Sequence, residues 1–261
     1  MTSKERVNKA IHFQGPDRVP ISCEDVFMLF MVPPQSWQPP EPYYPYIHPA
    51  IIRAGLWKPG RTLPDNWLTM TRTAIDEWGT IWRVSRIAHQ GEVEKGALEH
   101  GWDLLGRFQT PDFSDWARYA FFAEFGGQLG GDKYRMAIDE NSLWDRHNFL
   151  RGFENAMTDL IQHPAEVRRL LEILTTCRLT IVENFKKAGA DGFMLVDDWG
   201  SQKHTFISPT LFDEFFAPCY KQIVDTCHRL DMDCGIHSCG NIRLIVPRLI
   251  DIGFDFLQLD A

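Results

Sequence analysis

The C-terminal third of the chain alternates between short apolar runs and longer stretches with helical spacing, and this order constrains the fold most. Apolar runs typical of buried strands lie at residues 193–196, 234–236 and 254–259. Helical patterns separate them, over residues 208–230 and 242–252. Strands that are separated by single helices pair in parallel through right-handed crossovers. The sequence therefore predicts an α/β protein with a parallel sheet.

The first two thirds of the chain add further elements to this pattern. Residues 2–12 predict a helix, because Thr2 and Glu5 have the spacing of a capping box. The other expected elements are a first strand at 18–22, a hairpin at 77–82, a strand at 134–138 and helices at 149–160 and 164–188. We count about six strands before residue 261, whereas a closed parallel barrel needs about eight.

Composition excludes several classes of protein. With 44% hydrophobic and 24% charged residues, a chain of 261 residues can bury a sizeable core, and we expect one domain over residues 1–261. A net charge of -8 without a basic run argues against nucleic-acid binding. No apolar stretch approaches about 18 residues, and the charged N-terminus does not resemble a signal peptide. Six scattered cysteines suit a reducing compartment, so we expect a cytoplasmic protein.

Residues 32–64 form a segment of unusual composition between the first expected strand and the hairpin. They carry most of the prolines of the chain together with Trp37, Tyr43, Tyr44 and Tyr46. Aromatic residues are depleted in disordered segments, so we expect an ordered loop excursion. Two interpretations remain open: the loop lines a pocket, or it forms a collar on the surface.

Polar side chains follow four of the expected strands at the point where each strand ends. They are Cys23, Glu24 and Asp25, then Asp197 and Asp198, then His237 and Cys239, then Asp260. The carboxyl ends of parallel strands meet at one edge of a sheet, where α/β proteins collect their chemistry. Residues two apart on a strand share a face, so His237 and Cys239 could bind one zinc ion together. An acidic residue such as Asp197 can instead serve as a helix cap.

These residues occur within motifs that are arranged along the whole chain. The motifs begin at Lys4, Pro16, Arg151, Gly189, Asp197, Ile207 and His237; the two most specific are Asp-Asp-x-Gly-Ser-Gln at 197–202 and His-Ser-Cys-Gly-Asn at 237–241. In this order they resemble the uroporphyrinogen decarboxylase superfamily. The resemblance implies a (β/α)8 TIM-barrel type of fold.

The superfamily divides by chemistry, and the sequence resembles one branch more than the other. The decarboxylases bind a tetrapyrrole with many carboxylates through an arginine-rich N-terminal loop, but residues 21–33 contain no arginine. The corrinoid-dependent methyltransferases bind zinc through a His-x-Cys pair, which His237 and Cys239 match. The resemblance therefore favours the methyltransferase branch. A decarboxylase, or a truncated barrel without catalytic activity, remains an alternative.

The resemblance also implies roles for the polar residues. His237 and Cys239 would be zinc ligands, and Asp197 and Asp198 would be catalytic residues that orient a ligand or contact the substrate. Substrate-binding residues would be Glu24, Asp25 and Gln202. The reaction would move a methyl group between a corrinoid protein and a small-molecule acceptor, for which the resemblance offers a thiol. No Asp-x-His-x-x-Gly signature occurs, so the corrinoid would arrive on a separate protein.

The C-terminus raises the question of a third zinc ligand. In the methyltransferases the remaining ligand lies beyond the position that corresponds to residue 261, and Cys23 is the best substitute within this chain, against the alternative of a plain core cysteine. The sequence thus predicts a barrel that is incomplete at its C-terminus. Such a barrel would be completed by another chain or in a homo-oligomer.

Overall fold

The computed structural model describes residues 1–85 and 91–260, which form two compact units. The first unit consists of Met1–Met31, Tyr119–Asp145 and Val167–Ala261, and the second of Val32–Arg118 and Arg146–Glu166. The expectation of one domain over residues 1–261 stays a prediction. No helix in the described part of the chain is both long and apolar enough to cross a membrane.

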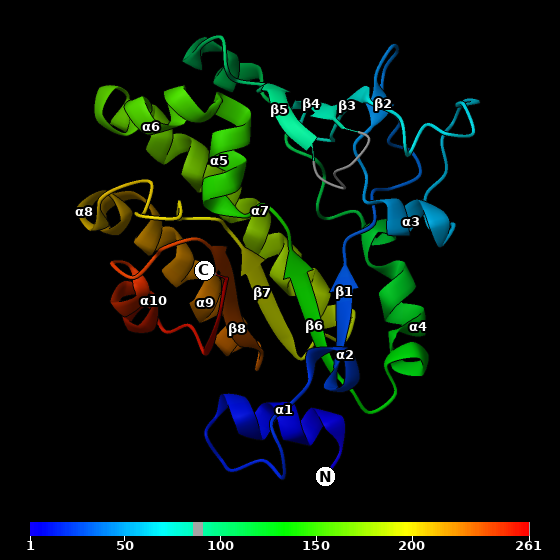
Figure 1. The fold of residues 1–261 in the computed structure, drawn as a ribbon, viewed down its shortest axis with the longest axis vertical. Coiled ribbons are helices and arrows are strands. Elements are labelled where there is room, and N and C mark those ends of the chain that lie inside the picture. The colour runs from blue at the N-terminus through cyan, green and yellow to red at the C-terminus, as the bar shows by residue number, and fades with distance from the viewer. Residues whose placement is uncertain (86–90, 261) are drawn as a thin grey trace. The chain divides into compact units, whose positions relative to one another are not determined.

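The first unit is built on a five-stranded sheet in the order β1-β6-β7-β8-β9, in which every neighbouring pair is parallel. The strands are β1 Val26–Phe30, β6 Tyr134–Asp139, β7 Gly192–Val196, β8 Asp233–Cys239 and β9 Phe256–Asp260. Because all five run in one direction, their carboxyl ends lie at the same edge (Figure 1). The predicted α/β class and parallel sheet are confirmed. The sheet is consistent with a TIM-barrel type of fold, and closure of a barrel is not seen in residues 1–85 and 91–260.

Helices lie between these strands along the chain. The helices predicted at 2–12, 164–188, 208–230 and 242–252 are confirmed in substance, whereas the helix predicted at 149–160 is interrupted at Gly152, which has a φ of 76°. The following helices belong wholly or in part to the first unit. They are α1 Ser3–Ile11, α2 Ser22–Asp25, α4 Ala120–Gly130, α5 Leu143–Arg151, α7 Pro164–Lys187, α8 Pro209–Leu211, the π-helical turn η3 Phe212–Phe216, α9 Ala217–Arg229 and α10 Val246–Ile252. The predicted capping box of α1 is present, with the Glu5 N–H donating to the Thr2 hydroxyl. The long helix α7 buries an apolar stripe that includes Leu170, Leu174 and Ile181.

The first strand lies later in the chain than the sequence analysis predicts. Residues 18–22 are not a strand; the short helix α2 begins at Ser22, and β1 is the apolar run Val26–Phe30. Pro16 and Pro20 lack the N–H that a ladder needs, whereas Val26–Phe30 pairs along its whole length with β6. Glu24 and Asp25 therefore precede β1, at the amino edge of the sheet and not at its carboxyl edge.

The second unit contains a four-stranded sheet in the order β2-β3-β4-β5. Its elements are β2 Tyr44–Pro45, α3 Pro49–Arg53, β3 Arg72–Ile75, β4 Ile81–Val84, β5 Gly91–Lys95, the 3-10 helices η1 Trp102–Arg107 and η2 Trp116–Arg118, and α6 Phe153–Gln162. The predicted hairpin is confirmed: β3 and β4 are antiparallel, and Gly79 has a φ of 80° in the turn. Residues 32–64 belong to this unit and include β2 and α3.

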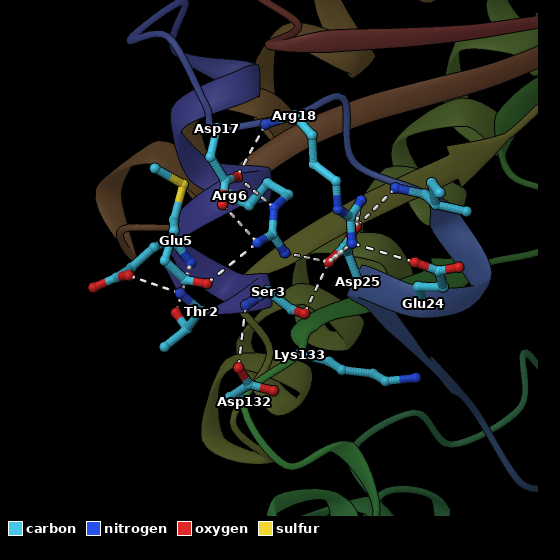
Figure 2. A network of polar contacts seen from close by, with 12 residues as sticks. Thr2, Ser3, Glu5, Arg6, Asp17, Arg18, Glu24, Asp25, Asp132 and Lys133 are labelled. Carbon is cyan, nitrogen blue, oxygen red and sulfur yellow. Dashed lines mark hydrogen bonds and ion pairs between the residues drawn. The ribbon is translucent and has the colours of Figure 1, made fainter.

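An ion network at the amino edge joins α1, α2 and the segment between them (Figure 2). The Asp25 carboxylate is fully buried and accepts hydrogen bonds from Arg6 Nη1 (2.7 Å), Arg18 Nη1 (2.7 Å) and Ser3 Oγ (2.8 Å). Arg6 also binds Asp17 through Nε at 2.6 Å. A buried carboxylate needs such partners, because an unpaired charge is costly in a low dielectric. The network therefore fixes α1 to the start of β1.

This network is expected to make the protein sensitive to acid. The Ile21 N–H, with Ser3, Arg18 and Arg6, holds the pKa of Asp25 well below its usual range, and Arg6 lowers the pKa of Asp17 to about 2. Both carboxylates therefore bind protons more weakly in the folded chain than in the unfolded one. Their contribution is fully present above about pH 5 and is lost as the pH falls from about 4 to 2.

The test is urea unfolding of the wild type and Asp25→Asn between pH 7 and pH 2. We expect the variant to be less stable at pH 7, and the difference to shrink as the pH falls. Asp103→Asn is the matched control, since the Asp103 side chain is 77% exposed and lies outside the network. Parallel stability curves for the wild type and Asp25→Asn would contradict this reading of the network.

Candidate metal centre

The carboxyl end of β8 presents an imidazole and a thiol on one face. The Cys239 Sγ lies 3.4 Å from the His237 Nε2, so the side chains two apart on the strand meet as predicted. Ser238 lies between them in sequence and is fully buried on the opposite face, where its Oγ accepts the Trp199 N–H at 3.0 Å. The alternation of β8 therefore separates a structural hydroxyl from two groups that can bind a metal.

Asp198, at the end of the neighbouring strand β7, completes a group of three possible ligands. Its Oδ1 accepts the backbone N–H of Cys239 at 2.8 Å and lies 3.7 Å from the His237 Nε2. One ligand atom from each of Asp198, His237 and Cys239 lies within 4.8 Å of the others. Nitrogen, sulfur and carboxylate oxygen together form a donor set that suits zinc. We call these three residues the DHC group.

The charges around Cys239 are negative. Burial and, to a smaller extent, the carboxylates of Asp198, Asp260 and Asp145 together raise the pKa of the Cys239 thiol to about 11. The thiol is therefore protonated at neutral pH in these surroundings alone. A divalent cation held by the DHC group would offset the carboxylates and favour the thiolate, which is the form that binds metals. The residues present thus fit a zinc ion.

Asp197, although adjacent to Asp198, is directed into the core. Its fully buried carboxylate accepts the backbone N–H groups of Leu143 (2.7 Å), Trp144 (3.2 Å) and Asp145 (2.9 Å), and also the Tyr220 hydroxyl. Burial raises the pKa of Asp197, while these hydrogen bonds act in the opposite direction. Asp197 is therefore the cap of α5, the alternative that the sequence left open.

Two glycines bring the ends of β7 and β8 together. A Cβ added to Gly200 would lie 2.7 Å from the Asn241 nitrogen, and one added to Gly240 would collide with the carbonyl group of Gly200. Gly240 also has a φ of 81°, which favours glycine. The Asn241 N–H donates to the Ser201 carbonyl at 2.7 Å across this contact. This close approach holds Asp198 beside Cys239.

The other predicted site residues lie elsewhere in the first unit. Glu24 and Asp25 are at the amino edge of the sheet, and Asp25 is occupied by the ion network. Cys23 is exposed in α2 at the same edge, so the structure does not bring it to His237 and Cys239. Gln202 is exposed in the turn after β7. The third possible ligand is Asp198 and not Cys23.

Two further residues, Asp145 and Tyr220, support the chain at the end of β7 and were not predicted from the sequence. The Asp145 carboxylate accepts the backbone N–H of Asp198 at 3.3 Å. Tyr220 donates to Asp197 and accepts the Trp199 indole N–H at 3.0 Å. Asp145 stands in the first turn of α5 and Tyr220 within α9, where a single sequence shows only ordinary helical residues. Nothing in the pattern of the chain could have marked them.

Comparison with known proteins supports the predicted family. Residues 148–261 match the family model described as uroporphyrinogen decarboxylase (URO-D). Among solved structures, a methyltransferase from Methanosarcina mazei is similar with a TM-score of 0.57 and 19% identity, over 98% of this chain and 75% of that one. No curated protein matches. The likeness in fold and the match over residues 148–261 confirm that this chain resembles the uroporphyrinogen decarboxylase superfamily.

Proposed function

We propose that the protein is a zinc-dependent methyltransferase that moves a methyl group between a corrinoid protein and a small-molecule acceptor, with a thiol as the acceptor. The observation that carries the proposal is the DHC group at the carboxyl edge of the parallel sheet. The similar structure is called a methyltransferase, which favours this reaction over decarboxylation. The absence of arginine from residues 21–33 also counts against a tetrapyrrole with many carboxylates.

In this proposal each member of the DHC group holds the metal. The ligand atoms would be the His237 Nε2, the Cys239 Sγ and the Asp198 Oδ1. Three protein ligands are typical of catalytic zinc sites, which keep a further position for a substrate. Zinc bound there would lower the pKa of a thiol acceptor, so that the acceptor is a thiolate nucleophile at neutral pH.

Residues around the DHC group would orient these ligands. Asp145 holds the backbone of Asp198, and Asp198 in turn holds the backbone of Cys239. Ser238 fixes the neighbouring backbone through Trp199. Such supporting hydrogen bonds restrict the positions of metal ligands, and losing them typically lowers metal affinity by about 10- to 100-fold.

The zinc content of the purified chain tests the proposal. We expect about one zinc per chain in the wild type and almost none in Cys239→Ala, because the variant loses a thiolate ligand. Cys23→Ala is the matched control: it removes an exposed cysteine at the other edge of the sheet and is expected to keep its zinc.

Methyl transfer from methylcobalamin to a small thiol is the second measurement. The reaction is expected in the wild type and in Cys23→Ala, and loss of at least about two orders of magnitude in rate is expected in Cys239→Ala. Zinc retained in Cys239→Ala would refute the metal assignment. Zinc lost in that variant without any methyl transfer in the wild type would refute the reaction and leave the metal site standing.

A further inference from the structure

Arg72 is the one buried arginine of the second unit that has no acidic partner among the described residues. The other three each have a carboxylate oxygen nearby: Arg118 has Glu77 at 2.6 Å, Arg146 has Asp76 at 2.8 Å and Arg151 has Asp159 at 2.7 Å. Arg72 is only 7% exposed. Residues 86–90 include no aspartate or glutamate, so no carboxylate comes from that segment.

The contacts of Arg72 leave part of its guanidinium group unused. Its Nη1 donates to the carbonyls of Leu68 and Met70, both at 3.2 Å, and the group lies 5.3 Å from the centre of the Trp67 ring. The Nε is buried and has no hydrogen-bond partner in the described part of the chain. Burial lowers the pKa of Arg72. A buried cation in this state is stabilised by an anion that brings its own acceptor oxygens.

A hollow of about 510 Å³ lies at this arginine and is lined only by residues of the second unit. Pro42, Tyr44 and Met70 give it apolar walls, and Tyr44 is stacked on Trp67 with ring centroids 6.2 Å apart. The charged groups that line it are Arg72, Arg83 and Glu94. Two cations and one carboxylate leave a net charge of about +1, which matches a monovalent anion.

We propose that this hollow binds a small organic carboxylate, with the carboxylate group on Arg72 and the apolar body against Tyr44 and Met70. A guanidinium forms charge-assisted hydrogen bonds with carboxylate oxygens, and that of Arg72 already lies over an aromatic ring. The apolar walls favour a ligand with a hydrocarbon or aromatic body over inorganic phosphate.

Calorimetric titration of the full chain with benzoate tests this site. We expect saturable binding to the wild type, with benzyl alcohol and inorganic phosphate each at least about tenfold weaker. Arg72→Met is expected to weaken binding roughly tenfold or more, because it removes a charge-assisted hydrogen bond to the ligand. Arg107→Met is the matched control: the Arg107 side chain is 78% exposed in η1, and binding should not change.

A second variant keeps the test decisive if Arg72→Met does not fold. Thr73 lines the hollow and is exposed, so Thr73→Trp fills the space while Arg72 stays in place. We expect this variant to lose benzoate binding and to keep the melting temperature of the wild type. No binding to the wild type, equal binding to Thr73→Trp, or phosphate binding as strong as benzoate would each overturn the proposal.

Discussion

Asp197→Ala is expected to lower the free energy of unfolding by about 3–4 kcal/mol. The variant leaves three backbone N–H groups at the start of α5 and the Tyr220 hydroxyl without their acceptor in a fully buried position. Each buried donor that loses its partner costs about 1–3 kcal/mol. Water molecules that enter the space left by the carboxylate can accept some of these hydrogen bonds, so the total loss is smaller than the sum of the individual costs. The free energy of unfolding of a typical domain is about 5–15 kcal/mol in total, so this loss is a large fraction of it.

Asp198→Ala provides the matched comparison one residue along the chain. The Asp198 side chain is 45% exposed and accepts one backbone N–H, from Cys239. We expect a loss of stability of about 1 kcal/mol, together with at least about a tenfold loss of zinc affinity. Neighbouring aspartates would thus separate a structural role from a metal-binding role.

Urea unfolding in the presence of a chelator measures the stability of both variants without a metal contribution. A zinc titration against a competing chelator measures affinity. Equal destabilisation by the two substitutions would contradict the assignment of Asp197 as the cap of α5. Unchanged zinc affinity in Asp198→Ala would remove Asp198 from the set of ligands.

The pair also shows what the sequence could predict about the site. His237 and Cys239 follow from the period of a strand, and the structure places their ligand atoms together. Asp197 and Asp198 both follow β7, but only one side chain can lie on each face, and the burial of α5 decides which carboxylate is enclosed. Which aspartate is buried therefore depends on a helix more than 50 residues earlier in the chain, and the local sequence around Asp197 contains no information about that contact.

The fold was predictable where strands and helices alternate without interruption. Residues 193–196, 234–236 and 254–259 all contain strands, because each run is apolar and helices separate them. The first strand was predicted at 18–22, since Val19-Pro20-Ile21 resembles a strand locally, while Pro20 lacks the N–H that pairing needs. The misplacement moved Glu24 and Asp25 to the wrong edge of the sheet in the prediction.

The second large effect that we expect is a loss of stability and of zinc affinity when the contact between Gly200 and Gly240 is disturbed. Gly240→Ala adds a Cβ that collides with the Gly200 carbonyl group, at a residue whose φ is 81°. Backbone strain of about 1–2 kcal/mol is then added to a clash that only a shift of the backbone can relieve. We expect a loss of about 3 kcal/mol in stability and a substantial loss of zinc affinity, because the shift separates Asp198 from Cys239.

Gly253→Ala is the control that introduces backbone strain without a steric clash. Gly253 has a φ of 103° at the end of α10, but the nearest atom to an added Cβ is the Val224 Cγ1 at 3.7 Å. This variant is expected to lose about 1–2 kcal/mol and to keep its zinc affinity. If both alanine variants behave alike in unfolding and in zinc titration, the close approach of the two turns does not position the metal ligands. A zinc affinity lowered in Gly240→Ala alone would show that the metal centre depends on backbone packing as well as on the three side chains that bind the ion.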